Sequence, residues 1–266
     1  MTDQPLVPPR DKPFRLKDYD PGYVKIKEKD AREHILALRV RLNELLDLMY
    51  ADKGHGLLVV LQGMDASGKD GAANSVFHDA GPVGCSVVDF HVPSEEERHH
   101  DYLWRVHKAC PERGKTVIFN RSHYEDVLVV RVRGFAPEAR WKARYEEIND
   151  FERLLTAENT VILKFFLYIS KEEQREQLQE RVDDPAKQWK FRMGDLDDRK
   201  LWDEYMAAYE DAIDRCNTEN APWHVVPSNH KWYRDVVIAE AIIARLEKLN
   251  LRYPKPEVGI QGLKIV

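Results

Sequence analysis

A short glycine-rich segment between two apolar stretches limits the folds open to this chain more than any other feature. Residues 57–61 read Leu-Leu-Val-Val-Leu, a continuous apolar run typical of a strand buried on both faces of a parallel sheet. Residues 63–70 then read Gly-Met-Asp-Ala-Ser-Gly-Lys-Asp, and residues 69–80 have a helical pattern. A strand, a loop with the spacing G-x-x-x-x-G-K and a helix together indicate a phosphate-binding loop. The sequence therefore predicts a site for a phosphorylated nucleotide or another polyanion.

The rest of the chain alternates the same two patterns. Strand-like apolar runs lie at residues 85–92, 116–119, 160–169 and 223–226. Helical patterns lie at residues 29–50, 94–110, 137–157, 170–182, 197–217 and 230–249. Strands that alternate with helices predict βαβ units, a central parallel sheet and an α/β three-layer sandwich. We expect one domain over residues 29–266, preceded by an extended arm at residues 1–28.

Composition and charge exclude several classes of protein. The 266 residues are 43% hydrophobic, enough for one substantial core. The net charge of -5 argues against a nonspecific nucleic-acid coat protein, although local binding of an anion stays open. No apolar run approaches the roughly 18 residues of a membrane helix, and the N-terminus lacks a signal-like apolar region. We therefore expect a cytoplasmic protein that binds neither nucleic acid nor membrane, with its three cysteines reduced.

The glycine-rich loop assigns distinct roles to its residues. Backbone N–H groups turned toward phosphate oxygens are expected from Gly63, Ala66, Ser67, Gly68 and Asp70. Lys69 would contact the phosphate that is transferred. Asp70 stands where a Ser or Thr usually binds Mg²⁺, and its simplest role is to cap the following helix. Asp65 then becomes the carboxylate expected to hold the metal or to orient the attacking group.

A second group of polar residues follows the apolar run at residues 116–119, where it would reach the carboxyl edge of the sheet. Asn120 occupies the position of a Walker B aspartate, and Arg121 can clamp phosphate oxygens with its planar guanidinium. His123 could act as a base, but a structural role is favoured at such a corner. Glu125 and Asp126 could add metal or nucleotide contacts, or could merely complement a helix dipole.

A third segment, at residues 181–192, is basic within an acidic protein. Between Lys187 and Lys200 there are five basic and three acidic residues. Alone, such a segment is typical of a solvated surface loop. It follows a phosphate-binding loop and carries two aromatic residues, so a phosphate clamp in a mobile lid is the alternative that we adopt.

These three segments resemble the second family of polyphosphate kinases. The family pattern of a G-x-D-x-x-G-K loop, an F-[DN]-R-S-x-Y strand end and an R-x-x-D-P-x-K-x-W-K lid matches residues 63–69, 119–124 and 181–190. The resemblance implies a P-loop kinase fold similar to that of thymidylate kinase, with a helical lid at about residues 181–200. It also implies transfer of phosphoryl groups between inorganic polyphosphate and nucleotides with Mg²⁺, for which Mn²⁺ could substitute.

The resemblance extends to individual positions. It implies catalytic roles for Asp65, Lys69, Arg121 and Arg181, with Asp65 as the metal ligand. It implies polyphosphate contacts from Lys187, Lys190, Lys231 and Arg234. From their place after the strand at residues 116–119, we also expect nucleotide contacts from Asn120, Glu125 and Asp126. The strand end Phe-Asn-Arg-Ser-His-Tyr at residues 119–124 is similar to the subgroup that accepts both AMP and ADP.

The predicted activity is therefore reversible phosphoryl transfer from polyphosphate to AMP and ADP, giving ADP and ATP. Two alternatives share the loop: an ATP-dependent nucleoside monophosphate kinase and a non-catalytic P-loop module that binds nucleotides. The basic lid favours polyphosphate, because a long anion needs several cations beyond one nucleotide site. The helical patterns at residues 29–50 and 137–157 could mediate contacts in a homo-oligomer or could face the core.

Overall fold

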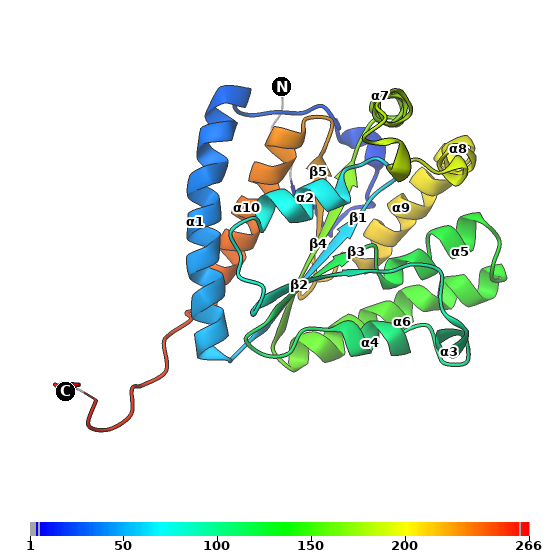
Figure 1. The fold of residues 1–266 in the computed structure, drawn as a ribbon. Helices are drawn as coiled ribbons and strands as arrows, with labels where there is room; N and C mark the ends of the chain where they lie inside the picture. Colours follow the sequence, from blue (N-terminus) through cyan, green and yellow to red (C-terminus); the bar gives the residue numbers. More distant parts are fainter. Residues whose placement is uncertain (1–3, 5, 261, 266) are drawn as a thin grey trace.

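The computed structural model describes residues 4, 6–260 and 262–265. Its centre is a five-stranded sheet in which every pairing is parallel, in the order β2-β3-β1-β4-β5 (Figure 1). The strands are β1 (Gly56–Gln62), β2 (Cys85–Asp89), β3 (Thr116–Asn120), β4 (Thr160–Tyr168) and β5 (Trp223–Pro227). Each predicted strand is present, so the predicted α/β fold with a central parallel sheet is confirmed.

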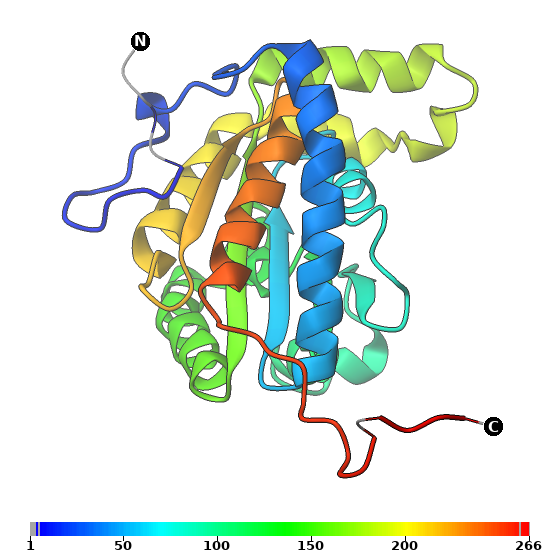
Figure 2. The same cartoon turned by 90° about the vertical axis from the view of Figure 1, so that its left-hand side faces the viewer.

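Helices cover both faces of the sheet and complete the three layers. One face carries α1 (Glu28–Asp52), α2 (Lys69–Val76) and α10 (Lys231–Glu247), and Figure 2 shows α1 and α10 side by side. The other face carries α4 (Trp104–Ala109), α5 (Val129–Val132), α6 (Glu138–Ala157) and α9 (Trp202–Cys216).

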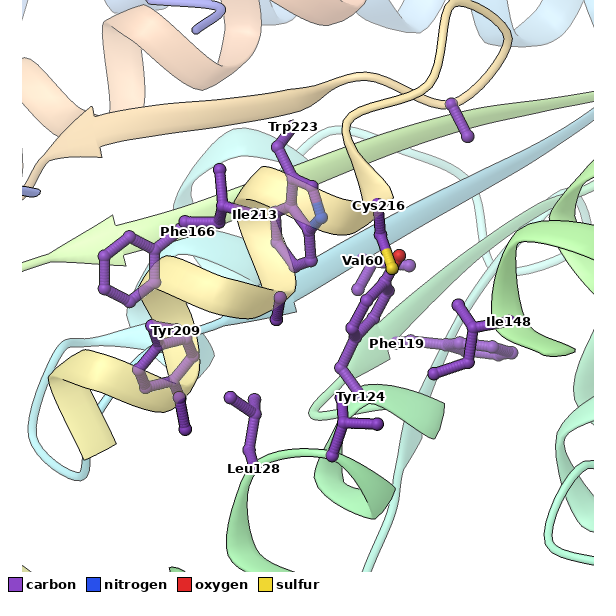
Figure 3. Close-up of a cluster of buried hydrophobic side chains, with 14 of the residues drawn as sticks. Val60, Phe119, Tyr124, Leu128, Ile148, Phe166, Tyr209, Ile213, Cys216 and Trp223 are labelled. Atoms are coloured by element: carbon purple, nitrogen blue, oxygen red, sulfur yellow. The ribbon is translucent and has the colours of Figure 1, made fainter. Parts of the chain in front are cut away.

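Each face has its own buried apolar cluster, and strand β1 contributes to both. Leu57, Val59 and Leu61 pack under α1 and α10, whereas Leu58 and Val60 pack under α6 and α9. Figure 3 shows part of the second cluster, in which side chains of α9 face those of the sheet. A strand that is apolar at every position is buried on both sides, as the unbroken apolar run predicts.

Two predicted helices are each divided in the structure. The pattern at residues 94–110 forms α3 (Glu95–Arg98) and α4, because the Asp101 carboxylate accepts a hydrogen bond from the Leu103 N–H and starts a new turn. The pattern at residues 197–217 is broken at Leu201, which separates α8 (Met193–Lys200) from α9. The helix α7 (Lys171–Asp183) is capped by Ser170, whose hydroxyl accepts a hydrogen bond from the Glu173 N–H.

The segment before α1 packs on the body of the protein. It contains the short 3-10 helix η1 (Leu16–Asp18), and Phe14, Leu16 and Tyr19 are buried in the cluster beneath α9. The first residues of the predicted arm, 1–3 and 5, lie outside the described part of the chain. At the other end, the chain after α10 leads away from the body (Figures 1 and 2). Among the described residues, no helix has the length and apolar character needed to span a membrane.

Candidate active site

The predicted site residues lie at the carboxyl edge of the sheet, where β1, β3 and β4 end. Strand β1 pairs with β3 on one side and β4 on the other, so the loop after β1 lies between the ends of both neighbours. The arrowheads of the strands point toward α7 and α8 (Figure 1). The chain leaves β1 for β2 on one side and later returns to β4 on the other, which makes this edge a topological switch point, where open α/β sheets bind ligands.

The loop backbone depends on its two glycines. Gly63 has a φ of +152°, and a Cβ there would lie 2.7 Å from the carbonyl oxygen of Leu167. Gly68 has a φ of +86°, and a Cβ there would overlap the guanidinium of Arg234. Because neither position has room for a side chain, the loop packs closely against β4 and Arg234 and keeps the curvature that a phosphate requires.

Lys69 is buried at the centre of the loop, with only 7% of its surface exposed. Its Nζ donates to the carbonyl oxygens of Gly63 at 2.6 Å and Met64 at 3.1 Å. Burial, assisted by the charge of Arg121, lowers the pKa of Lys69 to about 8. The side chain is therefore an ammonium at neutral pH, aimed into the loop. Ser67 Oγ is buried beside it and has no hydrogen-bond partner among the described residues.

Asp65 and Arg121 form an ion pair across the mouth of the loop, with Arg121 Nη2 2.7 Å from Asp65 Oδ1. Burial works to raise the pKa of Asp65, but the charges of Lys69 and Arg121 outweigh it and hold that pKa below its usual value. Arg121 has a φ of +60°, unusual for a residue with a side chain. The structure thus brings Asp65, Lys69 and Arg121 together, as the motifs predict.

The neighbouring carboxylates Glu125 and Asp126 point to different surroundings. Burial raises the pKa of Glu125, although Arg121 and Lys69 lie close enough to oppose it. Glu125 is therefore part of the same cluster. Asp126 instead pairs with Arg144 of α6 at 3.1 Å. Both residues lie on the short 3-10 helix η2 (His123–Asp126), whose tight turn sends adjacent side chains in different directions.

Asp70, in the first turn of α2, and Asn120, at the end of β3, contact each other through their side chains. The Asn120 side-chain amide donates to the Asp70 carboxylate. The expectation that Asp70 caps α2 is wrong, because the N-cap residue is Gly68 and Asp70 lies within the first turn. Its negative charge still complements the helix dipole there.

The lid brings one predicted cation and one unpredicted carboxylate to the site. Arg181, in the last turn of α7, lies 3.5 Å from Asp195 of α8 and 3.4 Å from the carbonyl oxygen of Lys190. The charge of Arg181 helps to lower the pKa of Asp65. Burial, followed by the charge of Asp65, raises the pKa of Asp195. Asp195 is therefore a site residue that sequence reasoning missed, since it was only one of three acids in a basic segment.

The four remaining predicted cations differ in their surroundings. Lys187 pairs with Glu180 of α7 and with Asp184. Lys190 Nζ lies 5.1 Å from the ring centroid of Trp189 on η3 (Gln188–Lys190). Lys231 Nζ donates to Gln177 of α7 at 2.7 Å. Arg234 is buried, bonds to Asp235 and lies against the loop at Gly68. Of these four side chains, Arg234 is the one that the structure seats on the phosphate-binding loop.

A buried glutamine connects the loop to the lid. Gln174 Nε2 donates to the Asp65 carbonyl oxygen at 3.0 Å, and Gln174 Oε1 accepts from Arg199 of α8 at 3.2 Å. Arg133 also binds Asp198 of α8 at 2.6 Å. The lid helix α8 is thus fixed to α7 and to the residue that follows α5. No motif identified Gln174, because its function depends on contacts distant in sequence.

The carboxylates at the loop fit a small divalent cation that is shared with phosphates. Asp65 offers an ionised carboxylate, and Glu125 and Asp195 interact with it electrostatically. Within the described residues there is no cluster of three or more side chains that could hold a metal alone. Mg²⁺ is commonly bound by one or two carboxylates together with substrate phosphates, and all-oxygen donors suit Mg²⁺ or Mn²⁺.

Comparison with known proteins agrees with this geometry. Residues 25–254 match the family described as polyphosphate kinase 2. The AMP/ADP-polyphosphate phosphotransferase of Meiothermus ruber is 51% identical over 95% of this chain and 96% of its own length. The ADP-polyphosphate phosphotransferase of Rhodopseudomonas palustris is 39% identical over 89% of this chain and 85% of its own length. The crystal structure of polyphosphate kinase 2 from Arthrobacter aurescens TC1 superposes with a TM-score of 0.92 at 40% identity, over 96% of this chain and 92% of that one. The predicted resemblance is confirmed, and the chain belongs to the polyphosphate kinase 2 family, which typically uses a divalent metal.

Proposed function

We propose that this protein reversibly transfers phosphoryl groups from inorganic polyphosphate to AMP and ADP, giving ADP and ATP. The observation that carries the proposal is the cluster of buried Lys69 with half-buried Arg121 and Asp65 at a P-loop. It occurs in a chain that is 51% identical to a relative named AMP/ADP-polyphosphate phosphotransferase.

The proposed chemistry relies on charge and position. The transferring phosphoryl group spreads negative charge over three oxygens, so fixed cations stabilise it most effectively in a site with little water. Lys69 and Arg121 supply such charges from the loop and the end of β3, and Arg181 supplies one from the lid. The backbone N–H groups of residues 63–70 would hold the neighbouring phosphates.

The acceptor requires no strong base from the protein. A nucleotide phosphate already carries a negative oxygen at neutral pH, because its second pKa is about 6. His123 is therefore not needed as a base. It is buried against Glu152 and belongs to the core, which is the structural role favoured for it by the sequence. The site therefore has to align two polyanions and reduce their repulsion.

We further propose that Asp65 holds Mg²⁺, with Mn²⁺ as a substitute and with Glu125 and Asp195 nearby. When bound, the ion would neutralise charge on the phosphates at the transfer point. An Asp65→Asn variant should need about tenfold more Mg²⁺ for half-maximal activity. The matched control is Asp126→Asn, which changes a carboxylate paired with Arg144 and should leave the Mg²⁺ requirement unaltered.

The same proposal assigns the remaining predicted residues. Asn120 and Glu125 would contact the nucleotide, whereas the pairing of Asp126 with Arg144 supports a structural role for that residue. The lid at about residues 181–200 would close over the phosphates. The lid would be part of a single kinase domain of residues 29–266, which follows the arm at residues 1–28. The polyphosphate chain would be bound by Lys187, Lys190, Lys231 and Arg234.

Two properties of the whole molecule belong to the proposal as well. We expect it to work in the cytoplasm, where adenine nucleotides are available. We also expect a homo-oligomer, because Leu36 and Val40 expose more than half of their surfaces on α1.

An assay without ATP tests the proposed function. AMP, Mg²⁺ and polyphosphate are incubated with the protein, and ADP and then ATP should appear. If AMP is phosphorylated only when ATP is supplied as donor, the protein is a nucleoside monophosphate kinase. Tight nucleotide binding with neither transfer nor hydrolysis would identify a binding module instead.

A further inference from the structure

A buried polar network lies directly behind the turn that carries Arg121 and Glu125. Its members are the side chains of His123, Tyr124, Glu152 and Lys164, each with 1% or less of its surface exposed. Lys164 lies on the interior strand β4 and Glu152 on α6. Charged groups in such a position are costly unless they are paired, so their presence needs a physical reason.

Lys164 is fully satisfied by three oxygen atoms. Its Nζ donates to Glu152 Oε2 at 2.6 Å, to the Tyr124 hydroxyl at 2.8 Å and to the Cys216 carbonyl oxygen at 2.8 Å. Burial works to raise the pKa of Glu152, but the charge of Lys164 and a hydrogen bond from His123 outweigh it and lower that pKa. The Glu152 side chain is therefore a carboxylate, and Lys164 joins β4, α6 and the end of α9.

The other end of the network holds the η2 turn. The Tyr124 hydroxyl donates to Glu152 Oε1 at 2.8 Å, and His123 Nε2 lies 3.2 Å from the same oxygen. Figure 3 shows Tyr124 extending from η2 toward Cys216 and Trp223. Two consecutive residues of the turn are thus fixed by one carboxylate beneath it.

The residues at the start of this turn are also hydrogen-bonded to β1, the strand that precedes the P-loop. Ser122 Oγ accepts from the Tyr124 N–H at 3.1 Å and from Gln62 Nε2 at 3.0 Å, and Gln62 is the last residue of β1. Arg121 lies between these contacts with a φ of +60°. A non-glycine residue keeps such a backbone conformation only when its surroundings determine it.

We propose that Tyr124 is a positioning residue for phosphoryl transfer. Glu152 and Lys164 hold the hydroxyl of Tyr124. The η2 turn is thereby oriented so that it presents Arg121 and Glu125 to Lys69. The inference rests on the proposed function, because it gives the turn a role in that reaction. Replacing a buried ion pair with apolar residues is often neutral or stabilising, so stability alone does not require this pair. The hydrogen bonds instead fix one orientation of the turn.

The test is Tyr124→Phe, assayed with AMP, Mg²⁺ and polyphosphate. The variant keeps the ring, whose centroid is 4.7 Å from that of Trp223, and it keeps the direct Lys164–Glu152 pair. We expect kcat to fall about tenfold with the KM for AMP nearly unchanged, because a misplacement of 1 Å can cost about 100-fold in rate. If the variant does not fold, the double variant Glu152→Gln with Lys164→Met replaces it, and the same fall in kcat is expected.

The matched control is Tyr145→Phe, which removes from another buried tyrosine a part-buried hydroxyl that accepts a hydrogen bond from Arg131 at 3.2 Å. It should lower the melting temperature, by less than Tyr124→Phe does, and leave kcat unchanged. In an Arg121→Lys background, Tyr124→Phe should cost less than twofold in kcat, because both changes act on the same group.

Two results would overturn the inference. One is an equal kcat for Tyr124→Phe and Tyr145→Phe, and the other is a full tenfold additional loss in the Arg121→Lys background. Either leaves the proposed function intact when the wild-type protein is active. A wild-type protein that is inactive with AMP and polyphosphate would overturn the proposed function, and the inference with it.

Discussion

The P-loop floor, formed by residues 63–70 and the end of β3, differs from the lid in how it holds its charges. In the floor, Lys69 is buried and bonded to backbone carbonyls, and Arg121 is fixed by its ion pair and its turn. In the lid, Lys187 is solvated and bonded to acidic neighbours, and Trp189 exposes 77% of its surface. Buried, preorganised charges can stabilise a transition state, whereas exposed charges mainly attract and guide a polyanion.

The largest effect should come from removing the central cation of the floor. Lys69→Ala should lower kcat by about 10³-fold or more, the range seen when a charge-stabilising cation is lost in phosphoryl transfer. Steady-state assays with AMP and polyphosphate measure this, with circular dichroism to verify the fold. Lys115→Ala is the matched control, since Lys115 is exposed and bonds to Glu112. Near-normal turnover of Lys69→Ala would contradict the assignment of Lys69.

The pH dependence should reveal the same buried cation. The pKa of Lys69 is lowered from 10.5 to about 8, so the ammonium is present below pH 8 and is lost above it. We expect kcat/KM to fall up to tenfold per pH unit above about pH 8. The kcat profile should turn down at a higher pH, because bound phosphates favour the charged form. A Lys69→Arg variant that retains activity should lack this fall. A wild-type kcat/KM that stays flat to pH 10 would count against the lowered pKa of Lys69.

Removing two cations of the lid should have a smaller effect, which should appear in the binding of polyphosphate and not in kcat. The double variant Lys187→Ala with Lys190→Ala should raise the KM for polyphosphate about three- to tenfold and change kcat less than twofold, because exposed charges are screened. Added salt should reduce the difference between variant and wild type. Measuring initial rates over a polyphosphate series at two salt concentrations checks both points. A large loss of kcat would show that floor and lid do not divide their tasks in this way.

The smallest effect on activity is expected from Asp126, although its neighbour Glu125 belongs to the site cluster. Asp126→Asn should lower the melting temperature by about 3 °C, through weakening of the half-buried pair with Arg144. Its kcat should stay within about twofold of wild type, while Glu125→Gln should reduce it clearly. Thermal unfolding and rate measurements on the two variants separate these outcomes. A stronger loss of activity in Asp126→Asn than in Glu125→Gln would reverse the assignment.

The floor was predictable from sequence because its residues are close together along the chain. An apolar strand, two glycines and a lysine determine the loop locally, and a second apolar strand brings Arg121 to the same edge. The division between α8 and α9 was not predictable from periodicity, because Leu201 continues the apolar pattern through the break.

Contacts between distant segments were not predictable. Gln174 meets the loop only because α7 follows the strand next to β1. Asp195 comes close enough to interact electrostatically with Asp65 only through the folding of the lid. The separation of Glu125 from Asp126 depends on the 3-10 geometry of η2, which the sequence pattern did not indicate. Motifs therefore located the site, and tertiary packing selected which of its polar residues meet.

The central claim, that polyphosphate is the phosphoryl donor, is tested most directly with ³²P-labelled polyphosphate and unlabelled AMP in the absence of ATP. Separation of the products should show the label in the terminal phosphate of ADP from the earliest times, and afterwards in ATP. Label that appears only as inorganic phosphate, or ADP that remains unlabelled, would contradict the account.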